Sequence, residues 1–205
     1  MHLPIHRLCA LVLALGVVAA CRDRAVPHSA TSTPAALCLP GERGYLRAKL
    51  GGAIDTELDW RGASLQCEGG ARPDGRGLRL SFLGPADVHG RQLRLVFGIT
   101  AGPGLGLSHR RPTNVTVIVE GQKQLYATQG EDKCAVETLV QEPLPAASAA
   151  ARSSLAREYR VAARGYCIDP ATALDGTARL YINRFDFAGL ARFEDNELHA
   201  AAPRH

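Results

Sequence analysis

The sequence predicts an all-β protein, an antiparallel β-sandwich of two sheets of the jelly-roll type, with a closed β-barrel as the alternative. The first supporting observation is the alternation of apolar and polar residues, as in Leu46, Ala48 and Leu50. The second is the regular return of turn sequences rich in glycine and proline, such as PDG at 73–75. The third is the scarcity of helical patterns. Only residues 146–155 have a helix-forming composition, and they carry no apolar stripe.

Alternation along the chain predicts about ten strands separated by short turns. Trp60 shares its strand face with Ile54 and Leu58, so we expect it in the core. A change of register near Arg184 predicts a β-bulge in the last strand. The glycine-rich segment 101–112 is predicted to be a loop, and since a strand rather than a helix follows, it is no phosphate cradle. The predicted strands cover residues 45–50, 54–60, 65–67, 78–82, 92–99, 114–120, 125–128, 134–141, 158–168 and 177–187.

The N-terminal residues have the layout of a secretory signal. Arg7 precedes an apolar, uncharged run, LCALVLALGVVAAC at residues 8–21, which ends in small residues. The run is too short for a stable transmembrane helix. Its last four residues, VAAC at 18–21, resemble the lipobox of bacterial lipoproteins. That resemblance implies cleavage before Cys21, a diacylglyceryl group on its sulfur and an acyl chain such as palmitate on its amino group.

Two alternatives concern the localisation of the mature chain. Cleavage by ordinary signal peptidase would instead leave a soluble protein with a free thiol at Cys21. In lipoproteins of Gram-negative bacteria an Asp after the cysteine favours the inner membrane, so Arg22 points to the outer membrane. We therefore expect a protein anchored by lipid in the cell envelope, facing the periplasm or the surface. The whole chain also resembles, loosely, sandwich-type envelope lipoproteins of unknown role, and that likeness transfers no site residue.

The domain organisation follows from composition. Residues 1–20 are predicted to be the signal peptide, and residues 21–36, rich in Ser, Thr, Pro and Ala, a lipidated flexible tether. Residues 37–193 should form one β-sandwich domain, long enough to bury most of its unfolded surface. The polar residues 194–205 lack periodicity and are predicted to be a disordered tail.

The cysteines predict two disulfides. The chain has six cysteines, of which Cys9 leaves with the signal, and lipid on Cys21 leaves four to pair in an oxidising periplasm. Antiparallel pairing of residues 134–141 with 158–168 brings Cys134 within one residue of the position opposite Cys167. This pairing predicts a Cys134–Cys167 bridge, and by elimination a Cys38–Cys67 bridge, which is one of three possible connectivities.

Two groups of residues are candidates for binding. The first group is aromatic and could contact a glycan: Tyr126, Tyr166 and Tyr181. The second group projects three carboxylates from one strand face, Asp55, Glu57 and Asp59, and could hold calcium together with the Glu131-Asp132 loop. The alternative for the second group is a solvated acidic face opposite basic residues of the neighbouring strand. The histidines show no zinc-ligand spacing, and the sequence calls for no cofactor.

These features favour a non-catalytic binding or structural module that holds an envelope protein, with a module for peptidoglycan or polysaccharide as the alternative. Basic residues are scattered, and Arg110-Arg111 is the only adjacent pair, so we expect no nucleic-acid surface. No nucleophile, base and orienting group stand in a recognisable motif, so an enzyme, such as a hydrolase, is the third possibility.

Overall fold

Eleven antiparallel strands and a short terminal helix make up the part of the chain that the computed structural model describes, residues 38–39, 41, 43–104, 106–146 and 155–200. The all-β prediction is confirmed. The strands pair without interruption from β2 to β3, in the order β2-β1-β11-β10-β7-β6-β5-β4-β3, and β8 and β9 branch from β6 and β11. The strands are β1 (Tyr45–Gly52), β2 (Thr56–Arg61), β3 (Gln66–Ala71), β4 (Leu78–Leu83), β5 (Leu93–Ile99), β6 (Leu107–Val119), β7 (Gln124–Ala127), β8 (Cys134–Pro143), β9 (Ala156–Cys167), β10 (Ala171–Ala173) and β11 (Arg179–Glu194).

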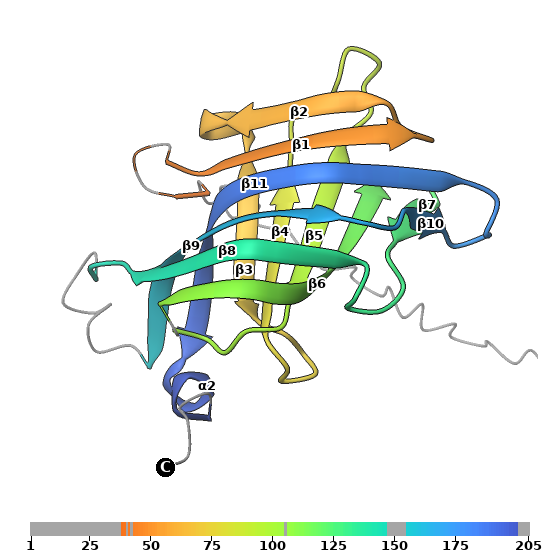
Figure 1. Cartoon of the computed structure of the whole chain (residues 1–205). Coiled ribbons are helices and arrows are strands. Elements are labelled where there is room, and N and C mark those ends of the chain that lie inside the picture. The colour runs from red at the N-terminus through yellow and green to blue at the C-terminus, as the bar shows by residue number, and fades with distance from the viewer. Residues whose placement is uncertain (1–37, 40, 42, 105, 147–154, 201–205) are drawn as a thin grey trace, which may run out of the picture. The chain divides into compact units, whose positions relative to one another are not determined.

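The two longest strands, β6 and β11, create the two layers. Along one edge of β11 lies β1, and along the other lie first β10 and then β9. In the same way β6 pairs with β5 on one edge and with β8 and then β7 on the other. Figure 1 shows β2, β1, β11, β9 and β8 running across the direction of β3, β4 and β5, which lie behind them. The strand path ends at β2 and β3, although β8 and β9 join β6 to β11 by a second route, so the sandwich is not a clean closed barrel.

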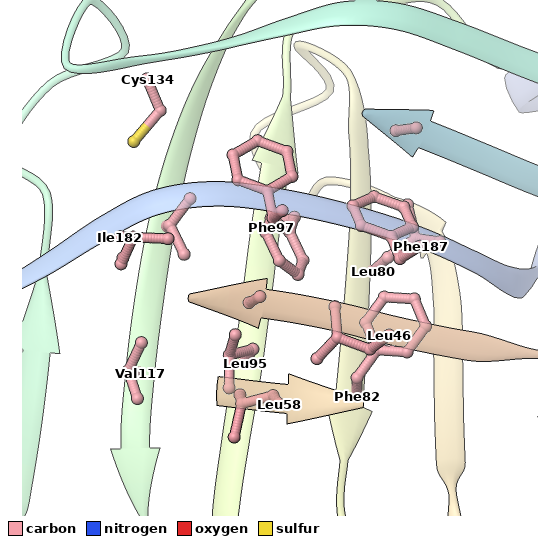
Figure 2. Close-up of a cluster of buried hydrophobic side chains, with 14 of the residues drawn as sticks. Leu46, Leu58, Leu80, Phe82, Leu95, Phe97, Val117, Cys134, Ile182 and Phe187 are labelled. Atoms are coloured by element: carbon pink, nitrogen blue, oxygen red, sulfur yellow. The ribbon is translucent and has the colours of Figure 1, made fainter. Parts of the chain in front are cut away.

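The core between the layers is built from the apolar side of each strand. Phe82 of β4 and Phe97 of β5 meet Phe185 and Phe187 of β11 there, and Figure 2 shows three of these rings among leucine side chains. The ring centroids of Phe97 and Phe187 are 4.6 Å apart, and those of Phe97 and Phe185 are 4.9 Å apart. Tilted contacts of this kind add about 0.5–1.5 kcal/mol each to the burial of the rings. Trp60 is also buried in this core, as predicted.

Both predicted disulfides are present, Cys38–Cys67 and Cys134–Cys167. Cys134 of β8 stands directly opposite Cys167 of β9, so the bridge joins two paired positions of neighbouring strands. The predicted bulge near Arg184 is confirmed as well. Lys49 pairs with Arg184 while Leu50 pairs with Ile182, which leaves one extra residue in β11.

Two predictions about segment boundaries were wrong. The segment 101–112 is not all loop, because Leu107 to Pro112 belong to β6. Proline is tolerated there since β5 pairs with β6 only from Thr113 onward, so this part of β6 is paired on one edge only. The tail 194–205 is not disordered throughout. Strand β11 continues to Glu194 because β9 pairs along it, and Asp195–Ala200 forms the helix α2.

Several predictions fall on residues outside the described ranges. They are the signal peptide at 1–20, the lipid site at Cys21, the tether at 21–36 and most of the helix-forming segment 146–155. Among the helices of the described ranges, none combines the length and the apolar character that a membrane crossing requires.

Candidate functional site

Strand β6 has an irregular backbone at Arg110, and strand β8 has one extra residue, Glu137, at the position that faces it. Arg110 has a φ of 50°, and it is the only non-glycine residue with positive φ in the described part of the chain. The residues on either side, His109 and Arg111, pair with Thr138 and Val136, and the pairing of β8 with β9 shifts by one residue at the same point. A left-handed conformation costs a non-glycine residue roughly 1–2 kcal/mol, and such strain concentrates at functional sites.

The irregularity changes which side chains face outward. In a regular strand His109 and Arg110 would lie on opposite faces. Here both are exposed, whereas Ser108 is buried and the Nε of Arg111 is completely buried. The adjacent pair Arg110-Arg111 is therefore divided, with one guanidinium on each side of β6, and each lines a different cavity.

The first cavity, which we name the Arg111 cavity, has a volume of about 610 Å³. Its charged lining residues are Arg72, Arg76, Arg111 and Glu197, and the backbone of Gly102 and neighbouring residues completes the wall. Arg72 and Arg76 come from the β3–β4 turn, Arg111 from β6 and Glu197 from α2. This volume is typical of small-ligand sites.

Arg72 is fixed by two carboxylates. Its Nη1 donates to Oε1 of Glu131 at 2.6 Å, and its Nη2 donates to Oδ2 of Asp74 at 2.7 Å. Burial opposes the charge on Arg72, but these hydrogen bonds outweigh it and raise the pKa of the guanidinium. The Arg72 bond, together with a hydroxyl bond from Thr100, lowers the pKa of Glu131. The pKa of Asp74 is also lowered, first by the backbone N–H of Arg76 and then by Arg72. The two carboxylates, Glu131 and Asp74, are therefore balanced by two arginines, Arg72 and Arg76.

The second cavity, which we name the Tyr166 cavity, lies on the other side of β6 and measures about 650 Å³. Tyr166 of β9 forms part of its wall with 38% of the residue surface exposed. The polar groups around the ring come from three other segments: His109 and Arg110 of β6, Glu131 and Asp132 of the β7–β8 loop, and Glu137 of β8. An apolar ring face surrounded by carboxylates and hydrogen-bond donors suits a ligand rich in hydroxyl groups.

The structure separates the three tyrosines that the sequence grouped. Tyr126 is 1% exposed and belongs to the core, so its assignment as a glycan contact was wrong. Sequence could not show this, because β7 has only four residues and its inward face depends on β6 and β10. Tyr181 is 46% exposed but lies outside the Tyr166 cavity. Of the three, Tyr166 alone stands in a cavity with polar groups of other strands.

The described residues give the calcium hypothesis no support. Asp59 accepts hydrogen bonds from Arg61 at 2.7 Å and from Arg47 at 3.4 Å, which lowers the pKa of its carboxyl, chiefly through Arg61. Asp55 and Glu57 are exposed on the same strand face. In the described ranges no group of three or more acidic, histidine or cysteine residues could hold a metal ion. The pairing of Asp59 with two arginines and the exposure of Asp55 and Glu57 favour the alternative, a solvated acidic face.

Comparison with protein-family models, with curated proteins and with solved structures gave no match. The candidate site therefore depends on the geometry of this chain alone. Sequence singled out Arg110-Arg111 as the one adjacent basic pair but not as a site. The signal that could have drawn attention to it is the pair's position directly before Pro112, two residues ahead of the predicted strand at 114–120.

Proposed function

We propose that this protein is a non-catalytic binding module of the cell envelope, anchored by lipid at Cys21, and that its Tyr166 cavity binds a glycan. The observation that carries the proposal is the partly exposed ring of Tyr166 in a 650 Å³ cavity with Asp132 and Glu137. Carboxylates accept hydrogen bonds from sugar hydroxyls, and an aromatic face covers the apolar face of a sugar ring. Peptidoglycan and surface polysaccharide are the glycans that an envelope protein meets.

A protein partner, which the sequence placed first, has less support from the surface. A docking site for a folded protein is expected to show a contiguous apolar patch. The most exposed large aliphatic side chains of the described residues instead come from five different segments, namely Val88, Leu107, Leu155, Ile168 and Leu174. The glycan is therefore the better-supported ligand.

The cysteine pairing supports the lipid anchor. Cys38, Cys67, Cys134 and Cys167 are all used in the two disulfides. None of them is left to pair with Cys21, so a disulfide within the mature chain does not account for that residue. Attachment of lipid to Cys21 removes the thiol and is consistent with the small residues that precede it.

The test is binding of soluble peptidoglycan fragments and surface-polysaccharide oligosaccharides to the full-length protein in detergent micelles, measured by titration calorimetry. Tyr166→Ala is expected to weaken saturable binding about tenfold or more, since it removes a stacking surface. Tyr181→Ala is the matched control, because Tyr181 is equally accessible and lies outside the cavity. The proposal fails if no oligosaccharide binds saturably, or if both variants bind as the unchanged protein does. A single envelope protein retained through Tyr166, with no glycan bound, would restore the protein-partner hypothesis.

A further inference from the structure

Arg111 contains the one buried side-chain nitrogen without a hydrogen-bond acceptor among the described residues, its Nε. Leaving a buried donor of a charged group unsatisfied is unfavourable, because the group loses its hydrogen bonds to water and gains none in the protein. Arg111 lines the Arg111 cavity, and in the described ranges it forms no ion pair. A native structure that keeps such a group calls for an explanation, and an anionic ligand in the cavity, which would offset the charge of Arg111, is one.

The nearby carboxylates are engaged elsewhere. Glu131 and Asp74 accept from Arg72, and Asp74 also forms an ion pair with Arg76 at 3.2 Å. Glu197 lines the cavity from α2, but its Oε2 accepts the backbone N–H of Glu194 at 2.8 Å and forms no ion pair with Arg111. Within the part of the chain that the structure describes, no neighbouring acidic side chain therefore offsets the charge of Arg111 directly.

We propose that the Arg111 cavity binds an oxyanion group of a small molecule, with Arg111 as the residue that anchors it. A guanidinium presents its N–H groups in a planar fork that matches two oxygens of a carboxylate, sulfate or phosphate. Arg76, whose side chain is 70% exposed, lies in the same wall and adds positive charge at the entrance. The oxyanion comes either from an inorganic ion or from the carboxylate of an acidic sugar, and the chemistry of recognition is the same.

This site is separate from the proposed glycan site. His109, Arg110 and Tyr166 line the Tyr166 cavity, while Arg111 faces the opposite side of β6. Glycan binding that depends on Tyr166 and anion binding that depends on Arg111 can therefore be present or absent independently.

The experiment is NMR titration of the ¹⁵N-labelled full-length protein in non-ionic detergent micelles, following the arginine side-chain Nε–H signals. The probes are inorganic phosphate, sodium glucuronate and, as the neutral match to glucuronate, glucose. We expect a saturable shift of the Arg111 Nε–H signal with phosphate or glucuronate and no shift with glucose. Arg111→Gln should weaken anion binding about tenfold or more, because a neutral amide replaces a charge-assisted fork. Arg179→Gln is the matched control, since Arg179 is exposed and lines neither cavity.

Each outcome of this titration either supports or overturns the proposal. Tighter binding of phosphate than of glucuronate identifies an inorganic or phosphorylated ligand, and the reverse order identifies an acidic sugar; either supports the proposal. It is overturned if no anion shifts the Arg111 signal saturably, or if Arg179→Gln weakens binding as much as Arg111→Gln does. The signal of the unchanged protein decides the matter even if a variant fails to fold.

Discussion

A substitution at Gly84, the residue that follows β4, tests how the two layers pack against each other. It is buried, and its backbone passes beneath the indole ring of Trp60 on β2. A Cβ added at Gly84 would lie within 3.0 Å of three ring atoms of Trp60, closer than real Cβ atoms come. The Gly84→Ala variant must therefore displace Trp60 from a position where only 8% of its surface is exposed, or move β2 away from β4.

The expected cost follows from overpacking. Inserting one methyl group into a well-packed core costs about 1–3 kcal/mol through displaced side chains and shifted backbone. For a domain of this size each kcal/mol lowers the melting temperature by about 2–4 °C, so we expect a fall of about 2–12 °C. Gly84 has no positive φ, so the loss would come from the clash with Trp60 and not from backbone strain.

Trp60 is the only tryptophan of the chain, so its fluorescence reports directly on the clash. Gly84→Ala should shift its emission to the red in the native state and lower the urea midpoint. The control is Gly51→Ala on β1, where an added Cβ would meet no atom within 4 Å and φ is not positive. That change should leave stability equal or raise it by about 0.4–1 kcal/mol. Equal urea midpoints and equal emission for the two variants would refute the packing described here.

Three further results are expected. Replacing both Cys134 and Cys167 by Ala opens a loop with a sequence separation of 33 and should lower the free energy of unfolding by about 4 kcal/mol, measured in urea without reductant. Glu131→Gln should cost about 1 kcal/mol at pH 7, because a partly exposed carboxylate loses its bond to Arg72. The folded-state pKa of Glu131 is below its ordinary value of 4.5. This contribution to stability is therefore present above about pH 4.5 and is lost as the pH falls through the folded-state pKa. In urea titrations at acid pH, the difference in stability between the variant and the unchanged protein should shrink. Cys21→Ser should abolish incorporation of labelled fatty acid in cells, and equal labelling would contradict the lipid anchor.

Much of the fold could be predicted because a half-buried sheet leaves a simple trace in the sequence. Each core strand alternates, as Leu93, Leu95 and Phe97 do, since one face contacts the other layer and the other face contacts water. The Cys134–Cys167 bridge followed from the same regularity, because two strands joined by a connection of known length have a nearly fixed register. The short strands and the ends of strands were harder to predict. The three residues of β10 are too few to show a period.

The site was harder to predict than the fold, because its residues depart from the regularity that made the fold predictable. Alternation assigns His109 and Arg110 to opposite faces, and only the left-handed backbone at Arg110 brings them together. Tyr166 is 56 residues beyond Arg110 in sequence number, and its place in the same cavity depends on β8 lying between β6 and β9. Neither fact has a signature in composition or spacing.

The irregular step between β6 and β8 has a consequence that packing alone does not require. Arg110 and Glu137 stand opposite each other, so the two strands gain an extra residue at the same point and their pairing resumes unchanged on both sides. Strands without these residues would keep the same hydrogen-bonded partners and would avoid the cost of a left-handed arginine. What the extra residues change is the set of side chains on each face, which places His109 and Arg110 beside Tyr166 while Arg111 faces inward. A local loss of stability that arranges polar groups around two cavities is the pattern expected of a binding site.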